Sequence, residues 1–310
     1  MSRILCVDAG GTFVKWAVMD AHDEIEDKGS VPTPVDDREA FLALIENLYR
    51  THEDIQGIAF SVPGIVIPET GYLRSAGAIP CLYECELAEL VSARCGNVPV
   101  SVENDGKAGA RAEMVSGALQ DCQNGAVIIL GTGIAGTIFI DRKIIRGPHL
   151  FAGELSYMYR DNSNIREDIP NEAYGPLTLP MRFMGRVTPA ALVRRYCEMS
   201  GEELQATDCP LLFERMEAGD QTAYTVIREA AHDLAMMIMN IQAVIDPDAF
   251  ALGGGISAQD SFIRMVQESV KMYKPVDKPI CVVPDVRVCK YRGSANLYGA
   301  LYAFREKYGE

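Results

Sequence analysis

Three glycine-rich turns, each following a strand-like apolar run, are the first feature of this sequence that could do chemistry. Glycine lets backbone N–H groups approach an anion closely, because no Cβ stands in the way. Any one such turn also fits an ordinary tight hairpin, whereas three together indicate a cradle for phosphate groups. The turns contain Gly10, Gly11 and Thr12, then Gly131, Thr132 and Gly133, and finally Gly253, Gly254 and Gly255.

Two common nucleotide-binding motifs are excluded by the residues that come after their glycines. Residues 131–136 have the spacing G-x-G-x-x-G, but the dinucleotide motif needs a helix there, and residues 137–140 have a strand-like pattern. The phosphate loop G-x-x-x-x-G-K-[ST] is absent, because Gly106 and Lys107 are followed by Ala108. The remaining arrangement is similar to the β-hairpin phosphate cradle of actin-like ATPases.

In such a cradle, Thr12 and Thr132 donate hydrogen bonds to phosphate oxygens, and the third glycine run flanks the adenosine. Asp8 holds Mg²⁺ directly or through water, because Mg²⁺ usually keeps several of its waters. Lys15 either adds a positive charge near the phosphates or is simply an exposed lysine of a strand, and both interpretations remain open.

A carboxylate that could accept a proton stands where a strand passes into a helix. Phosphoryl transfer to an alcohol needs in-line positioning, neutralised phosphate charge and a carboxylate that takes the hydroxyl proton. A free aspartate is ionised at neutral pH, and its proximity makes it useful as a base. We assign Asp105 this role. Asn104 or Asp105 also fits a helix cap, and the two roles are compatible.

The order of apolar patterns predicts an α/β protein, because strands and helices alternate. A methionine-rich stripe in the longest expected helix is typical of a core or a subunit interface. Residues 160–180 are polar and loop-like. We expect a hairpin over 4–8 and 14–19, strands near 57–62, 98–102, 125–130, 137–140 and 250–252, and helices near 38–50, 106–119, 222–245 and 294–307.

Charge and composition exclude several classes of protein. The 310 residues carry a net charge of −14, which argues against nucleic acid as a direct partner. No apolar stretch of about 18 residues occurs, so no membrane span is expected, and the run 4–7 is too short for a signal peptide. The nine cysteines are scattered without a CxxC pair, which favours reduced thiols and a cytoplasmic location.

The motifs together resemble the ROK family (repressors, open reading frames and sugar kinases) from about residue 4 to residue 305. This resemblance implies an actin-like, ribonuclease-H-type fold with two α/β domains around a cleft. The small domain would contain residues 1–117 and about 296–310, and the large one residues 118–295. The motifs, in family order, are Asp8–Lys15, Ser61–Val66, Glu103–Asp105, Gly131–Gly133, Gly153–Glu154 and Gly253–Ile256.

The resemblance also implies an activity and its residues. ROK enzymes transfer the γ-phosphate of ATP to a hexose or hexosamine, usually at the 6-hydroxyl, with Mg²⁺. Asn104 and Asp105 would bind the acceptor sugar, Asp105 would be the base, and Glu154 would bond sugar hydroxyls. Gly64 would lie near the sugar. The family also suggests a homodimer.

The sequence departs from the motifs of many ROK members at three places, all on the sugar side of the expected site. Many members have a histidine and then a cysteine-rich zinc loop, where this chain has Tyr157 and no cysteine between Cys122 and Cys197; no zinc site is therefore expected. Gly77 and its neighbours stand where many members read Pro-Asn-Leu-Pro, and Gly106-Lys107 replaces Ala-Asn. Tyr157 adds an aromatic face near the anomeric end of the sugar. In this respect the chain resembles the zinc-free branch of the family, which includes β-glucoside kinases.

Two other functions remain as alternatives to a kinase. A ROK repressor would carry a helix-turn-helix before the first glycine turn, and Asp8 leaves no room for one. A catalytically weak sugar-binding or regulatory protein without a DNA-binding domain fits the altered sugar side, although the intact Asp105 argues against it.

Overall fold

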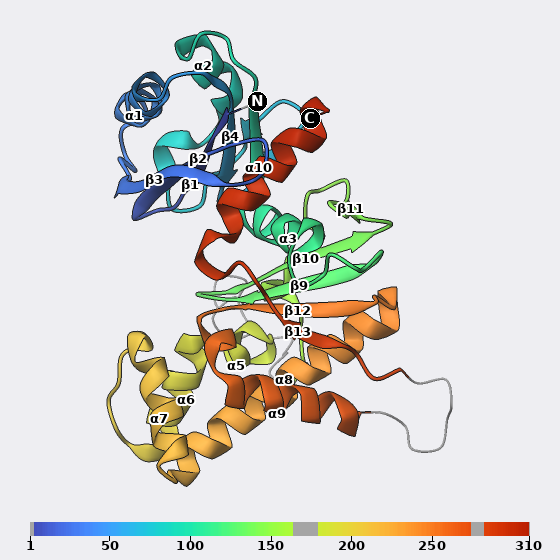
Figure 1. Ribbon diagram of the computed structural model, residues 1–310. Helices are drawn as coiled ribbons and strands as arrows, with labels where there is room; N and C mark the ends of the chain where they lie inside the picture. Colours follow the sequence, from blue (N-terminus) through green and yellow to red (C-terminus); the bar gives the residue numbers. More distant parts are fainter. Residues whose placement is uncertain (1–2, 164–178, 274–281, 310) are drawn as a thin grey trace. The chain divides into compact units, whose positions relative to one another are not determined.

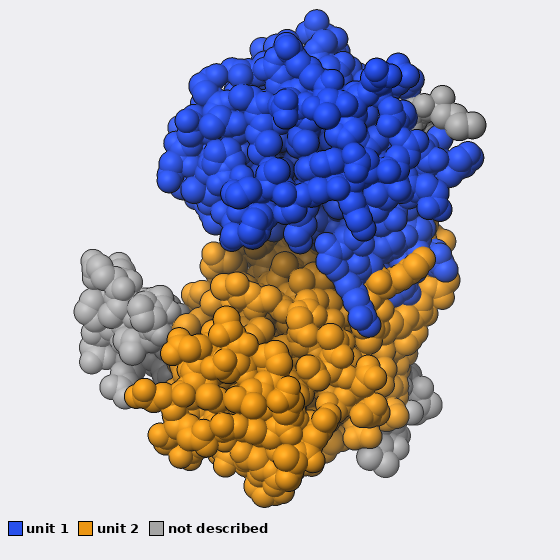
Figure 2. All heavy atoms as spheres, turned by 60° about the vertical axis from the view of Figure 1, so that its left-hand side comes forward, with its two compact units in different colours: residues 1–120, 291–310 blue, residues 121–290 orange. Residues whose placement is uncertain are grey.

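The computed structural model of this protein describes residues 3–163, 179–273 and 282–309. The chain divides into two compact units, which we describe separately. Unit 1 contains residues 1–120 and 291–310, and unit 2 contains residues 121–290 (Figures 1 and 2). Within the described ranges, no helix combines the length and apolar character needed to cross a lipid bilayer.

Unit 1 is built on a five-stranded sheet with the order β3-β2-β1-β4-β8. β1 and β2 form the predicted hairpin, whereas β4 and β8 run parallel to β1. Parallel strands place their carboxyl ends at one edge of a sheet, so the residues that end β1, β4 and β8 become neighbours. The strands are β1 (Arg3–Ala9), β2 (Phe13–Met19), β3 (Ile25–Pro32), β4 (Ile55–Val62) and β8 (Val100–Asn104).

The helices of unit 1 bury apolar faces against this sheet and against each other. The predicted face of α1 is buried through Phe41, Leu42, Ile45 and Leu48. The last helix, α10, packs closely on α3 (Figure 1). The two backbones are so near that a Cβ at Gly299 would overlap the backbone of Ala108. The helices are α1 (Arg38–Thr51), α2 (Leu87–Arg94), α3 (Asp105–Val115) and α10 (Ala295–Tyr308), and a small sheet adds β5 (Val66–Ile67), β6 (Tyr72–Leu73) and β7 (Cys85–Glu86).

Unit 2 repeats the same local arrangement on a second sheet, with the order β11-β10-β9-β12-β13. β9 and β10 form an antiparallel hairpin, and β12 runs parallel to β9, as β4 runs parallel to β1 in unit 1. The strand–turn–strand pattern that the sequence shows twice therefore folds the same way twice. The strands are β9 (Gly125–Leu130), β10 (Ile134–Ile140), β11 (Lys143–Ile144), β12 (Ala249–Gly254) and β13 (Val286–Val288).

The helices of unit 2 lie together on one side of its sheet (Figure 1). The longest, α8 (Gln221–Ile245), matches the expected helix, and its Met237 and Ile241 are buried in the core while Met236 is partly buried. The other helices are α5 (Met184–Val187), α6 (Pro189–Ser200), α7 (Cys209–Glu217) and α9 (Asp260–Met272).

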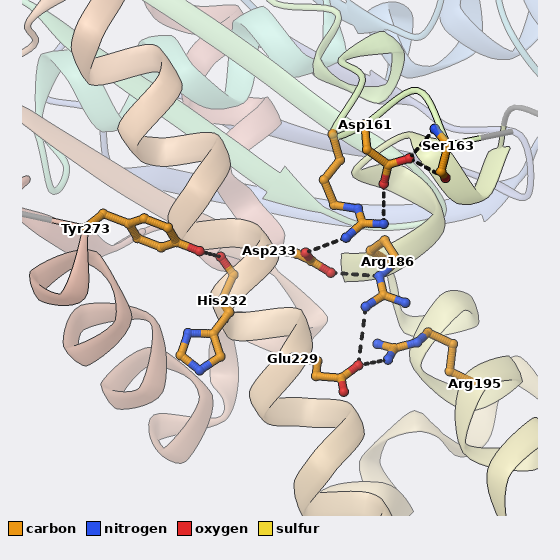
Figure 3. A network of polar contacts seen from close by, with 9 residues as sticks. Asp161, Ser163, Arg186, Arg195, Glu229, His232, Asp233 and Tyr273 are labelled. Carbon is orange, nitrogen blue, oxygen red and sulfur yellow. Dashed lines mark hydrogen bonds and ion pairs between the residues drawn. The ribbon is translucent and has the colours of Figure 1, made fainter. Parts of the chain in front are cut away.

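A polar network ties this helical layer together (Figure 3). Arg186 of α5 donates from Nε to Asp233 of α8 over 2.7 Å and lies 3.3 Å from Glu229. Glu229 also pairs with Arg195 of α6. Arg160 lies 3.6 Å from the buried Asp233, so the segment that follows Tyr159 is anchored to α8 as well.

The helix expected over 106–119 ends earlier, at Val115. Gly117, a weak helix former, follows two residues later. The buried Glu113 carboxylate accepts the Ala118 N–H over 2.8 Å, and this bond replaces the helical pairing that would continue the helix. Of the loop expected over 160–180, residues 164–178 lie outside the described part of the chain.

Candidate active site

Three polar residues are placed side by side where the parallel strands of unit 1 end. The register pairs Asp8 of β1 with Ser61 of β4, and Ser61 with Glu103 of β8. Asn104 ends β8, and Asp105 begins α3 directly afterwards. The sheet therefore brings the predicted Mg²⁺ ligand Asp8 to the same edge as the predicted base Asp105.

Among the described residues, the hydrogen-bond donors to Asp8 all lie on one oxygen of its carboxylate. Ser61 Oγ donates to Oδ1 over 3.3 Å, and Asn296 Nδ2 donates to the same oxygen over 3.0 Å. Within the described ranges Oδ2 has no hydrogen-bond partner. Burial raises the pKa of Asp8 above its usual value of 3.8, while the Asn296 and Ser61 donors and the charge of Lys15 oppose that rise.

The first glycine turn is held in place through its carbonyl groups. Thr33 donates its N–H to the Thr12 carbonyl over 3.1 Å and its hydroxyl to the Gly10 carbonyl over 2.6 Å. A Cβ at Gly11 would stand 2.6 Å from Cβ of Ala78, so glycine is required for this close approach. The exposed Thr12 hydroxyl has no hydrogen-bond partner in the part of the chain that is described.

Lys15 and Lys107 lie in opposite environments. Lys15 stands opposite Asp8 in the β1–β2 ladder and is exposed, which keeps both of its interpretations open. Lys107, in the first turn of α3, is buried and is therefore not a solvated lysine.

The side chains of Asn104 and Asp105 are fixed by short local bonds. Asn104 Oδ1 accepts the Lys107 N–H over 3.1 Å, which makes Asn104 the N-cap of α3. Asn104 Nδ2 donates to the Gly64 carbonyl over 2.9 Å and to Asp105 Oδ1 over 3.1 Å. Asp105 Oδ1 also accepts the Gly106 N–H over 2.8 Å. Cap and candidate base are thus adjacent residues at the start of one helix.

Gly64 and Gly77 lie against each other beside Asn104. A Cβ at Gly64 would stand 2.9 Å from the Gly77 nitrogen, and both glycines have positive φ angles, 97° and 55°. Tyr83 donates its hydroxyl to the Gly77 carbonyl over 2.7 Å and so fixes this loop. The residues of unit 1 that the sequence singled out therefore form one continuous patch at the carboxyl edge of its sheet.

The second and third glycine runs meet at the corresponding edge of unit 2. Leu130 of β9 pairs with Gly254 of β12, so the Gly131–Gly133 turn begins beside the end of β12. The Thr132 hydroxyl is exposed and has no described partner, and Cβ atoms at Gly131 and Gly255 would enter open space. Gly253 differs from its neighbours, because it is buried within β12.

Glu154 and Tyr157 lie on a short segment that packs on the β9–β10 hairpin. Ser156 Oγ accepts the Ile134 N–H over 2.8 Å, and Gly153 approaches Gly136 too closely for a Cβ on either residue. Glu154 precedes a 3₁₀ turn, η2 (Leu155–Tyr157), and its carboxylate has no partner among the described residues. Tyr157 is exposed.

Sequence reasoning did not assign roles to several residues that hold this arrangement. Asn296 is 288 positions from Asp8, so no local pattern could reveal their bond. Glu103 is only 2% exposed, accepts the Asn104 N–H over 2.9 Å and lies 3.3 Å from Arg111. Ser61 and Glu103 belong to the motifs named above, and each lies one residue before the end of its strand, which was the available signal.

The groups present fit a nucleotide with a divalent cation. One oxygen of Asp8 is held by two donors while the other is left for a cation or its water, and two exposed hydroxyls stand on glycine turns. Anionic phosphates and hard cations prefer such donors and carboxylate oxygens. The cation would therefore depend on Asp8 together with water and phosphate oxygens, because no group of three or more histidine, cysteine or acidic side chains among the described residues could hold a metal ion.

A charged group held at a binding site should cost the folded protein stability. We predict that Asp8→Asn makes the protein more stable at pH 7, because burial penalises the Asp8 carboxylate and asparagine can still accept both hydrogen bonds. The raised pKa means that wild-type stability falls as pH rises through it. The advantage of Asp8→Asn should therefore vanish as pH falls below 3.8, as urea unfolding at several pH values can show. A variant less stable than wild type at pH 7 would contradict this prediction.

Comparisons with known proteins agree with this geometry. The family model of the ROK family matches residues 4–307. The β-glucoside kinases of Klebsiella pneumoniae and Listeria monocytogenes are 27% and 28% identical to this chain, over 99% and 98% of it and 97% and 98% of their own lengths. A solved ROK family protein from Streptococcus pneumoniae TIGR4, in complex with sucrose, is 30% identical with a TM-score of 0.85, covering 99% of both chains.

These comparisons confirm the predicted actin-like ATPase fold and the predicted ATP-dependent carbohydrate kinase. The two β-glucoside kinases match this chain over nearly its whole length and nearly all of their own. Because the family model covers nearly every residue as well, the chain belongs to the ROK family.

Proposed function

We propose that this carbohydrate kinase transfers the γ-phosphate of ATP to the 6-hydroxyl of a hexose or hexoside, with Asp105 as the general base. The observation that carries the proposal is the position of Asp105. It follows Asn104 at the carboxyl edge of the sheet, where β1 also delivers Asp8. A proton acceptor and a phosphate-side carboxylate thus stand at one sheet edge, as phosphoryl transfer to an alcohol requires.

In phosphoryl transfer to an alcohol, the main task of the protein is to position the acceptor hydroxyl, the phosphate and the base. The acceptor oxygen attacks the γ-phosphorus, the bond to the β–γ bridging oxygen breaks, and ADP leaves. Asp105 takes the proton that the acceptor hydroxyl loses. The Gly106 N–H and the Asn104 amide both donate to Asp105 Oδ1, and these two bonds hold the carboxylate in position for that step. Such base catalysis contributes about 10²- to 10⁴-fold.

The phosphate side of the proposal rests on the glycine turns. Thr12 and Thr132 would donate to phosphate oxygens, with Lys15 adding positive charge, and Gly254 and Gly255 would flank the adenosine. Asp8 would hold Mg²⁺, which when bound neutralises phosphate charge. Because Gly253 is buried in β12, it would shape the turn rather than contact the nucleotide.

The acceptor side of the proposal uses Asn104, Gly64, Gly77, Glu154 and Tyr157. The Glu154 carboxylate, which has no partner among the described residues, is suited to sugar hydroxyls. Two curated relatives are named β-glucoside kinases, and a solved relative holds the two-ring sugar sucrose. We therefore propose a β-glucoside as the preferred acceptor.

The position of the new phosphate tests this proposal. We expect ³¹P–¹H correlation NMR of the product from Mg-ATP and a β-glucoside to show phosphorus coupled to the two H6 protons. The matching 6-deoxyglucoside, which lacks only the acceptor oxygen, should yield no product. Phosphate on any other oxygen would overturn the assignment of O6.

A further inference from the structure

Three aromatic side chains of unit 2 are exposed within nine residues of one another. Phe151 is 56% exposed, Tyr157 is 52% exposed and Tyr159 is 43% exposed. Large aromatic side chains usually bury most of their surface, so a gathering of exposed rings marks a candidate binding surface. We call Phe151, Tyr157, Tyr159 and the neighbouring Arg182 the aromatic platform.

The members of the aromatic platform are arranged against each other. The rings of Phe151 and Tyr157 lie 5.3 Å apart at 48°. The Arg182 guanidinium lies 5.4 Å from the Tyr157 ring centre and 5.2 Å from that of Tyr159, within the range of cation–π attraction. Arg182 Nη2 also donates to the Tyr159 hydroxyl over 3.2 Å. Arg182 thus joins the two tyrosines into one surface.

The backbone beneath the aromatic platform is tied down on two sides. Tyr159 forms a β-bridge with Arg182, and the Phe183 N–H donates to the Met158 carbonyl over 3.2 Å. On the other side, Ser156 bonds the β9–β10 hairpin, and Arg160 reaches Asp233 of α8. A surface held in place before binding loses little entropy when a ligand stacks on it.

The aromatic platform adjoins the residue that we propose as a sugar ligand. The Tyr157 N–H donates to the Glu154 carbonyl over 3.0 Å, so the two residues lie on one 3₁₀ turn. A hexose held by Glu154 would therefore have its substituents next to the rings. Resting on the proposed acceptor role of Glu154, we infer that the aromatic platform binds the aglycone ring of a β-glucoside acceptor.

The chemistry of the aromatic platform indicates which aglycones fit. Ring faces attract other rings by stacking, and stacking depends little on the pattern of polar groups. Arg182 lies over both tyrosine rings and donates one N–H to the Tyr159 hydroxyl, so it helps to hold the rings in place. The inferred class is a glucoside with an aryl or second sugar ring, rather than free glucose.

The chain supplies a matched control for a test. Tyr224 of α8 is 38% exposed and has the Arg228 guanidinium 5.5 Å from its ring centre, but it lies outside the aromatic platform. Tyr224→Ala removes an exposed tyrosine ring that contacts an arginine, as Tyr157→Ala does, but at a place outside the aromatic platform. Any effect that Tyr224→Ala shares with platform variants would be a general effect on folding or surface.

The test compares kcat/KM for phenyl β-glucoside with kcat/KM for glucose. We expect Phe151→Ala and Tyr157→Ala each to lower the ratio of kcat/KM for phenyl β-glucoside to kcat/KM for glucose by about tenfold, mainly because KM for the glucoside rises. Tyr157→Phe, which keeps the ring, should restore the ratio, and Tyr224→Ala should leave it at the wild-type value. Calorimetric titration with phenyl β-glucoside should show the same loss of affinity without any turnover.

The outcomes separate this inference from the proposed function. A wild-type enzyme that phosphorylates neither glucose nor phenyl β-glucoside would overturn the proposed function. An active enzyme whose ratio is the same in Tyr157→Ala and Tyr224→Ala would leave that function standing and overturn the aromatic platform. A wild-type preference for glucose over phenyl β-glucoside would overturn it too.

Discussion

Asp105→Asn is expected to lower kcat for phosphoryl transfer by about 10²- to 10⁴-fold without disturbing the fold. Asparagine has nearly the shape of aspartate, and its Oδ1 can still accept the Gly106 N–H and the Asn104 amide. The substitution therefore removes the ability to take a proton and leaves the start of α3 intact. Steady-state kinetics with Mg-ATP and the best acceptor measure the loss.

The control for this variant should reproduce every effect except the loss of the base. Asp260 is the first residue of α9, as Asp105 is the first residue of α3, and it is exposed. Asp260→Asn removes a carboxylate from the same position relative to a helix dipole, which is worth about 0.3–1 kcal/mol. A kcat for Asp105→Asn close to that of Asp260→Asn would show that Asp105 is not the base.

Gly254→Ala is expected to destabilise the protein by about 3 kcal/mol or more. The backbone at Gly254 has φ 91° and ψ 174°, a conformation essentially restricted to glycine, and such strain costs about 1–3 kcal/mol. A Cβ there would also overlap the Leu130 carbonyl oxygen, and overpacking adds about 1–3 kcal/mol. Chemical unfolding in the absence of nucleotide measures the effect.

The neighbouring glycine separates folding from nucleotide binding. A Cβ at Gly255 meets nothing within 4 Å, so Gly255→Ala should change the unfolding free energy by less than about 0.5 kcal/mol. Because the proposed adenosine position adjoins this glycine, the same variant should weaken ATP binding in a calorimetric titration. Equal stability of Gly254→Ala and Gly255→Ala would contradict the described turn.

The parts of the site that were predictable from sequence are those with short-range patterns. The β1–β2 hairpin follows from a glycine turn between two apolar runs, and Asn104 was recognisable as a cap because it precedes α3. Asp8 and Asp105 could be proposed because each stands at the end of an apolar strand. Parallel pairing of β1, β4 and β8 then brings those ends together.

The parts that were not predicted depend on long-range contacts or on weak patterns. Asn296 reaches Asp8 only because α10 returns to unit 1, and Arg182 meets Tyr157 through a bridge between distant residues. β3 is mostly exposed, so it lacks a regular apolar alternation, and β13 has only three residues. By contrast, α9 buries Phe262, Ile263, Val266 and Val270 at helical spacing, a signal that the sequence did contain.

Sugar-dependent release of ADP is the measurement that tests the central claim most directly. The wild-type protein would be incubated with Mg-ATP and a panel of hexoses, hexosamines and β-glucosides in a coupled assay. We predict ADP release that depends on the sugar, with the highest kcat/KM for a β-glucoside. ADP release that no sugar on the panel stimulates would contradict a carbohydrate kinase.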